Sequence, residues 1–132
     1  MANPDIVSVA HIYGGTKFLA PSTTGQYSLL NNAASSGLVY KVGSIVVSNT
    51  STAAVTATVA YYNAAVTEGS TVSAGTAYPI AYQISVPPNA SLVVTDKTTA
   101  FYLLENACVA VTSGTSNNLT FVVSYESITA TP

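Results

Sequence analysis

Residues 44–63 read SIVVSNTSTAAVTATVAYYN, a stretch without a single charge that is rich in valine, threonine, alanine and tyrosine. In its second half, successive residues would fall on opposite faces of a strand, and one of these faces carries Val55, Ala57, Val59 and Tyr61. A period of two is the pattern of a β-strand with one face toward a core. The turn residues Asn49-Thr50-Ser51 separate this half from the apolar run before it, so the stretch predicts a β-hairpin.

The same alternation recurs along the rest of the chain. In AYPIAYQISV (77–86), the face expected toward the core carries Tyr78, Ile80, Tyr82, Ile84 and Val86. Pro79 has no N–H to donate, which places this strand at a sheet edge or puts the proline at the strand's start. In LTFVVSYES (119–127), the apolar face carries Leu119, Phe121, Val123 and Tyr125.

Turn signals such as Gly14-Gly15, Ser36-Gly37 and Pro87-Pro88-Asn89 separate the strand patterns every ~8–15 residues. They predict strands near 6–13, 26–30, 38–49, 54–62, 76–86, 91–95, 100–104, 108–113 and 119–127. No segment shows a sustained helical period. We therefore predict an all-β fold, a single antiparallel β-sandwich of jelly-roll type with about 8–9 short strands. Residues 1–22 are expected to be an N-terminal arm or first strand and residues 23–132 the sandwich, in one domain overall.

Charged residues make up only 6% of the 132 residues, and the net charge is −2. Binding to nucleic acid or to an anionic membrane needs clustered Lys or Arg, and the chain has only Lys17, Lys41 and Lys97. We expect neither partner, and we find no signal peptide and no apolar run long enough for a membrane helix. A surface of Thr, Ser, Ala and Tyr is poorly protected against association. It indicates a chain covered by copies of itself or by another protein, the alternative being a sparingly soluble monomer.

The residues that could carry chemistry are few and scattered. His11 is the single histidine, and Cys108 stands in the core-like run CVAV, so neither predicts a metal site or a nucleophile. The acids stand near turns, near strand ends or in the N-terminal segment, and none forms an indicated pair: Asp5, Glu68, Asp96, Glu105 and Glu126. We expect no catalytic, cofactor-binding or metal-binding residues, and no enzyme.

Taken in order, several segments resemble small all-β virion structural proteins of tailed bacteriophages, particularly those that infect cyanobacteria. The motifs that carry the resemblance are Ser48-Asn49 at a strand end, the "VPxxxSLV" segment 86–93, the "DKxxxxYL" segment 96–103 and the closing Ser124-Tyr125-Glu126. Where this family often has an acidic-Gly turn, the chain has Glu105-Asn106, and Asn also tolerates positive φ.

The resemblance implies a virion component similar to capsid decoration, or cement, proteins. Such a protein would lie on the outer capsid surface, associate with itself as a trimer, and bridge neighbouring subunits of the major capsid protein. The N-terminal segment could be an arm that lies on a neighbour. The alternative is a tail or fibre module that binds host-surface carbohydrate, which would require Tyr61, Tyr62, Tyr78 and Tyr82 to gather on one exposed face.

Overall fold

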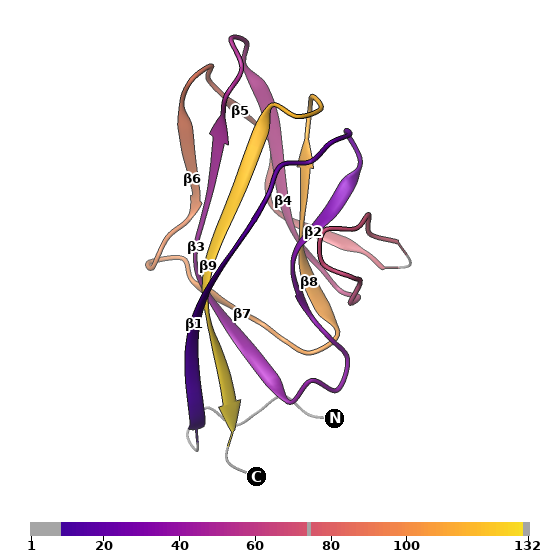
Figure 1. The fold of residues 1–132 in the computed structure, drawn as a ribbon, viewed down its shortest axis with the longest axis vertical. Helices are drawn as coiled ribbons and strands as arrows, with labels where there is room; N and C mark the ends of the chain where they lie inside the picture. Colours follow the sequence, from indigo (N-terminus) through magenta and orange to yellow (C-terminus); the bar gives the residue numbers. More distant parts are fainter. Residues whose placement is uncertain (1–8, 74, 131–132) are drawn as a thin grey trace.

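The computed structural model describes residues 9–73 and 75–130, which fold into two antiparallel β-sheets packed face to face (Figure 1). The strands of this part are β1 (Val9–Leu19), β2 (Gln26–Asn32), β3 (Leu38–Asn49), β4 (Val55–Tyr62), β5 (Ala77–Val86), β6 (Ser91–Thr95), β7 (Phe101–Leu103), β8 (Ala107–Ser113) and β9 (Leu119–Ala130). The prediction of an all-β sandwich of eight or nine strands is confirmed. In the described ranges, no helix is long and apolar enough to span a membrane.

The strands pair in a nested order. One sheet, called sheet A, has the order β1-β9-β3-β6, with β7 also paired to β3; sheet B has the order β2-β8-β4-β5. The first strand thus pairs with the last, the second with the last but one, and so on inward to β4 and β5. This is a long hairpin rolled up on itself, the jelly-roll form of the β-sandwich.

The core lies between the two sheets. Along much of β3, β4 and β9, alternate residues point into it, which is the physical origin of the period of two in these segments of the sequence. Phe121 on β9 is the largest fully buried side chain in the described part, and it belongs to a cluster with Leu30, Ile45, Leu103 and other apolar residues.

The stretch 44–63 does not form a hairpin, and this prediction is wrong. β3 pairs only within sheet A and β4 only within sheet B, so the chain crosses from one sheet to the other between them. Val47 and Val55, before and after the crossing, are buried in the same core cluster from opposite sides. Alternation of apolar and polar residues indicates that one face of a strand is buried. The same pattern is expected whether the next strand pairs with it in a hairpin or lies in the other sheet.

The side chain of Asn49 fixes the geometry of this crossing. Its Nδ2 donates to the carbonyls of Ala53 and Val86, both at 2.9 Å, and its Oδ1 accepts the N–H of Ser51 at 2.9 Å. The side chain is almost completely buried. It ties the end of β3 to the end of β5 in the other sheet, whereas the sequence indicated only a turn residue.

The Gly14-Gly15 pair, predicted as a turn, lies in the middle of β1. This strand pairs with β9 without interruption from His11 to Leu19. Gly15 leaves room for packing, because a Cβ added there would come within 2.7 Å of the ring of Tyr125. Residues 6–8 of the predicted first strand lie outside the described residues, and so the N-terminal arm stays a prediction for residues 1–8.

Replacing Gly15 by alanine is expected to destabilise the fold. The ring of Tyr125 also packs against Tyr40, with centroids 5.1 Å apart, so it has little room to move away from a new methyl group. Overpacking of this kind costs about 1–3 kcal/mol of unfolding free energy. Gly14→Ala is the matched control, because a Cβ there meets nothing within 4 Å. Urea unfolding followed by far-ultraviolet circular dichroism gives both values, and equal losses would refute this account of Gly15.

The prediction for β5 is half right. The strand lies at the edge of sheet B, as Pro79 indicated. However, the face expected toward the core is largely exposed, with 41–64% of the surface of Tyr78, Ile80, Tyr82 and Ile84 open to solvent. The register with β4 shifts twice, and Gln83 adopts positive φ (49°). Each such irregularity interrupts the alternation of faces, so the period of two in the sequence does not describe one buried face.

Candidate interaction surfaces

His11 and Cys108 do not form a pair. His11 is exposed on β1 of sheet A, where its ring stacks against Tyr13 with centroids 5.7 Å apart. Cys108 is fully buried on β8 of sheet B, in a small cluster with Tyr62 and Ala110. Burial raises the pKa of the Cys108 thiol, which keeps it protonated and unreactive at neutral pH.

Glu68 serves the fold. One of its carboxylate oxygens lies 3.4 Å from the Nζ of Lys17, and the other accepts the N–H of Asn31 at 3.0 Å. The Glu68 charge raises the pKa of Lys17. The contacts tie β1 and β2 to the segment that follows β4, which makes Glu68 a structural acid.

Two further acids bond to connections between strands, Glu105 to a distant one and Asp96 within its own turn. The Glu105 carboxylate accepts the N–H of Gly37 at 2.7 Å. The Asp96 carboxylate accepts the hydroxyl and the N–H of Thr98, which lowers the pKa of Asp96. In the described part of the chain, no three His, Cys, Asp or Glu side chains are grouped so as to hold a metal ion. Asp5 lies outside that part.

The four tyrosines that a carbohydrate site would need do not share an exposed face. Tyr62 is buried and its hydroxyl accepts the N–H of Gly75 at 2.7 Å. Tyr61 is half-buried, and its hydroxyl accepts the N–H of Leu104. Only Tyr78 and Tyr82, both on β5, are well exposed. The structure therefore does not assemble the stacking platform that this alternative requires.

A groove of about 320 Å³ lies on the outer face of sheet A. It opens where the register between β3 and β9 shifts, between Val42 and Ser44. Its lining includes two of the three lysines and one acid: Lys41, Gly43, Ser44, Lys97, Ser124, Tyr125 and Glu126. Its lining therefore carries charges of both signs.

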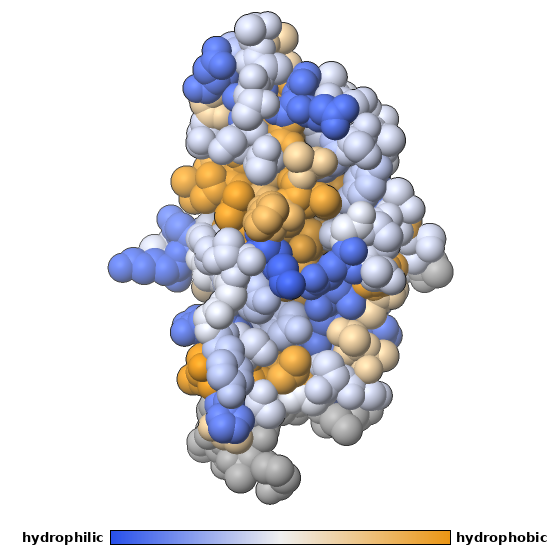
Figure 2. Space-filling model, viewed as in Figure 1, coloured by the Kyte–Doolittle hydropathy of each residue, from blue (hydrophilic) through white to orange (hydrophobic). Residues whose placement is uncertain are grey.

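The outer face of sheet A carries an apolar row that crosses the whole sheet. Phe18 lies opposite Val122, Val122 opposite Val46, and Val46 opposite Val93, one residue from each of β1, β9, β3 and β6. We call these four residues the Phe18 row. Its two ends are the most open, with Phe18 76% and Val93 59% exposed. Figure 2 shows an apolar band across the middle of this face.

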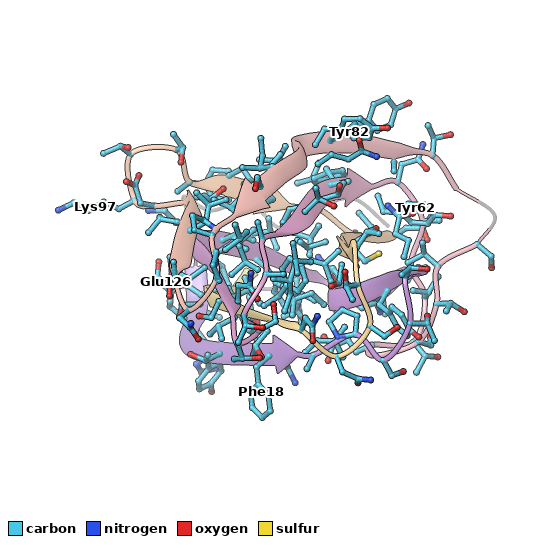
Figure 3. The ribbon with its side chains drawn as sticks, turned by 90° about the horizontal axis from the view of Figure 1, so that it is seen from above. Phe18, Tyr62, Tyr82, Lys97 and Glu126 are labelled. Atoms are coloured by element: carbon cyan, nitrogen blue, oxygen red, sulfur yellow. The ribbon has the colours of Figure 1, made fainter. Side chains whose placement is uncertain are left out.

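Neutral hydroxyl residues border the Phe18 row. On one side the neighbouring row contains Ser48 and Ser91, whose hydroxyls lie 3.2 Å apart. On the other side it contains Thr16 and Ser124, with their hydroxyls 3.5 Å apart. The Phe18 row and these hydroxyl residues can be covered by protein without the cost of removing ions from water. Figure 3 shows Phe18 projecting from this face and Tyr82 from the opposite side of the sandwich.

A sequence signal for the Phe18 row existed and was missed. The runs Ile45-Val46-Val47, Leu92-Val93-Val94 and Phe121-Val122-Val123 have three apolar residues in succession. In a regular strand, successive side chains point to opposite faces, so such a run places an apolar residue on the outer face as well as the core face. Where three strands carry this signal side by side, an apolar outer surface follows.

Comparison with known proteins gives distant similarities in fold. No family model and no curated protein sequence matches the chain, so the resemblance to phage virion proteins stays a prediction. Similar structures include a chain of the acid-stable capsid of Helicobacter pylori bacteriophage KHP30, at 12% identity and a TM-score of 0.45, with 91% of this chain and 89% of that chain covered. Another is the infectious bursal disease virus VP2 subviral particle, at 13% identity and a TM-score of 0.36, with 92% and 34% covered. A third is the CBM22-1-GH10 portion of Clostridium thermocellum xylanase 10B, at 14% identity and a TM-score of 0.27, with 92% and 26% covered. At these identities and TM-scores, the similarities do not bear on the function of this chain.

Proposed function

We propose that this chain is a non-enzymatic structural protein of a bacteriophage virion. In this proposal it is a capsid decoration protein that lies on the outer surface of the head and bridges neighbouring subunits of the major capsid protein. The observation that carries the proposal is the exposed Phe18 row on the outer face of sheet A, together with the uncharged hydroxyl residues that border it. Together with the sequence resemblance, it favours a protein whose role is to bind other protein subunits through this face.

The mechanism is burial of surface. An exposed apolar row on the outer face of a sheet contributes free energy when a partner removes it from water, at about 25 cal/mol per Å² of apolar area. A contact of ordinary size buries about 1,600 Å² in total, and the symmetry of a capsid repeats it many times. The sum would oppose the outward pressure of packaged DNA. Self-association as a trimer is the stoichiometry that the resemblance implies, and light scattering of the purified chain checks it.

The position of the chain in the virion is tested by electron cryo-microscopy of intact particles that contain it. We expect density that fits this sandwich at regular positions on the outside of the head, with the face of sheet A toward the shell. Density at the tail alone would reject the decoration role. Binding of the purified chain to a glycan array, with no binding to heads, would favour the carbohydrate-binding alternative instead.

The contact face is tested with two variants and heads that lack this chain. Val93→Lys places a charge at the exposed end of the Phe18 row and is expected to weaken co-sedimentation with the heads by about tenfold or more. Tyr82→Lys is the matched control, because Tyr82 is as exposed as Val93 but lies on the other sheet. If Tyr82→Lys alone abolished binding, the contact would lie on sheet B and the proposed face would be wrong.

A further inference from the structure

The sandwich has four lateral edges, and three of them are closed to pairing with another strand. The edge at β2 is covered by the chain's own residues 69–72: Ser28 N–H donates to the carbonyl of Ser70, Gly69 N–H to that of Ser28, and Val72 N–H to that of Gln26. The edge opposite β1 in sheet A is broken into two short strands, β6 and β7. Short or covered edges are common protections against unwanted pairing.

The edge at β5 is closed in another way. Pro79 lacks an N–H, Gln83 has positive φ, and the register with β4 shifts twice along the strand. Proline and bulges interrupt the regular row of donors and acceptors that a new strand would need. The exposed apolar side chains of β5 therefore stand on an edge that cannot be extended regularly.

The edge at β1 has none of these protections. From His11 to Leu19 the strand is regular, contains no proline, and has Lys17 as its only lysine or acid. Within the described residues, no strand pairs with its outer side. Alternate N–H and C=O groups of β1 consequently point away from β9, ready to receive another strand. Ile12, Tyr13 and Phe18 are well exposed beside them.

Two apolar rows of sheet A end at this open edge. The Phe18 row ends at Phe18. A second row, called the Ile12 row, runs from Val39 through Ile128 to Ile12. Because β1 is regular between them, Ile12 and Phe18 point to the same outer face. Val39 and Ile128 are buried, whereas Ile12 at the edge is 56% exposed.

We propose that the β1 edges of two copies of this chain pair antiparallel about a two-fold axis at Gly15, with Ile12 of each copy opposite Phe18 of the other. Gly15 is the midpoint of the regular stretch His11–Leu19, so with this axis the whole stretch of one copy pairs with the same stretch of the other. A two-fold contact uses the same strand on both sides and is closed by symmetry. The two sheets A become one continuous sheet. The Phe18 row of each copy then runs on into the Ile12 row of the other.

Charge supports the same register. Lys17 of one copy lies opposite Tyr13 of the other, so no like charges meet, and Gly14 lies opposite Thr16. Shifting the axis by two residues to Lys17 would place the two Lys17 side chains face to face, which is destabilising. Shifting it by one residue either way pairs Phe18 with Ala10 or with Gly14 and separates the two apolar rows. A second copy is thus a better match to this edge than an arbitrary strand.

Cysteine cross-linking tests the register. Chains carrying Gly14→Cys are mixed with chains carrying Thr16→Cys and oxidised; the native Cys108 is buried and does not react. Opposite residues of an antiparallel pair have Cα atoms about 4.5–5.5 Å apart, which suits a disulfide. We expect a covalent dimer in the mixture and little in either variant alone. Cross-linking of Gly14→Cys with itself, or none in the mixture, would overturn the register.

Charge substitution tests the contact in solution. Phe18→Glu and Ile12→Lys, each alone, are expected to halve the mass of the largest species in sedimentation velocity and to weaken association about tenfold or more. The double variant Ile12→Lys/Phe18→Glu should restore it, because each new charge then faces its opposite on the second copy. Tyr82→Lys on β5 should change nothing. Failure of the double variant to recover, or a wild-type chain that stays monomeric at millimolar concentration, would refute the pairing.

This inference does not depend on the capsid role. A chain that binds heads but stays unpaired would refute the β1 contact and leave the proposed function standing. A chain that pairs through β1 but binds no heads would refute the proposed function and leave the β1 contact standing. Circular dichroism of each variant verifies that it is folded, and all the substituted side chains are exposed or, at Gly14, have open space for a Cβ.

Discussion

Phe121→Ala is expected to lower the free energy of unfolding by about 3–5 kcal/mol. Phe121 is the largest fully buried side chain in the described part, and it belongs to the core cluster between the two sheets. Removing its ring loses the transfer free energy of the buried atoms and leaves a cavity lined by side chains from both sheets. Because native domains are stable by only about 5–15 kcal/mol, this single change would remove a large part of the total.

The chain offers a matched control for Phe121 on the adjacent strand. Phe18→Ala deletes the same atoms from a position that is 76% exposed, so the unfolding free energy should change by no more than about 0.5 kcal/mol. Urea unfolding monitored by circular dichroism measures both, at a protein concentration low enough to keep the β1 edge unpaired. If the two substitutions had similar costs, the burial pattern of β9 and β1 described above would be wrong.

Asn49→Ala is expected to cost about 2–5 kcal/mol. Its amide is almost fully buried and donates to the carbonyls of Ala53 and Val86. Its removal leaves the buried Val86 carbonyl without this donor, at about 1–3 kcal/mol. The Ala53 carbonyl keeps the hydroxyl of Ser51 as a donor and loses one bond worth about 0.5–1.5 kcal/mol. The N–H of Ser51 loses its acceptor as well. Since these bonds join β3 of one sheet to β5 of the other, the loss should also loosen the crossing between the sheets.

Two further variants isolate the role of the Asn49 amide. Asn49→Asp keeps the shape but turns a donor into a carboxylate facing two carbonyls, and it should cost at least as much as Asn49→Ala. Asn118→Ala is the control, because Asn118 contributes its carbonyl to Thr50, which the substitution retains. Hydrogen exchange at β3 and β5 should increase in the Asn49 variants alone; unchanged exchange there would show that the crossing is held by other contacts.

The fold class was readable from the sequence because period-two alternation has one physical cause, burial of one strand face. The β3 and β6 ranges were predicted correctly, and Asn106 adopts the positive φ that its turn predicted (58°). The errors have physical causes too. Gly14-Gly15 was predicted as a turn because glycine pairs are common in turns, whereas in the structure Gly15 leaves room for the ring of Tyr125 on β9.

The candidate surfaces were less predictable than the fold. The low charge indicated a covered surface but not where it lies. The Phe18 row exists only because three apolar runs come into register across neighbouring strands, which pairing decides. Likewise Tyr62 and Tyr82 carry the same side chain in the same kind of pattern, and only their places in sheet B make one buried and the other exposed.

By itself, the sequence determined that this chain is a nearly uncharged all-β sandwich, since alternation and composition are local properties that each strand carries alone. The tertiary structure alone decided which strands share a sheet, that residues 44–63 cross between sheets, and that β1 is left with an open regular edge. Those outcomes depend on the pairing of strands that are far apart in the chain. His11 and Thr129, for example, lie opposite each other on β1 and β9. Pairing of this kind leaves no mark on either segment when it is read separately.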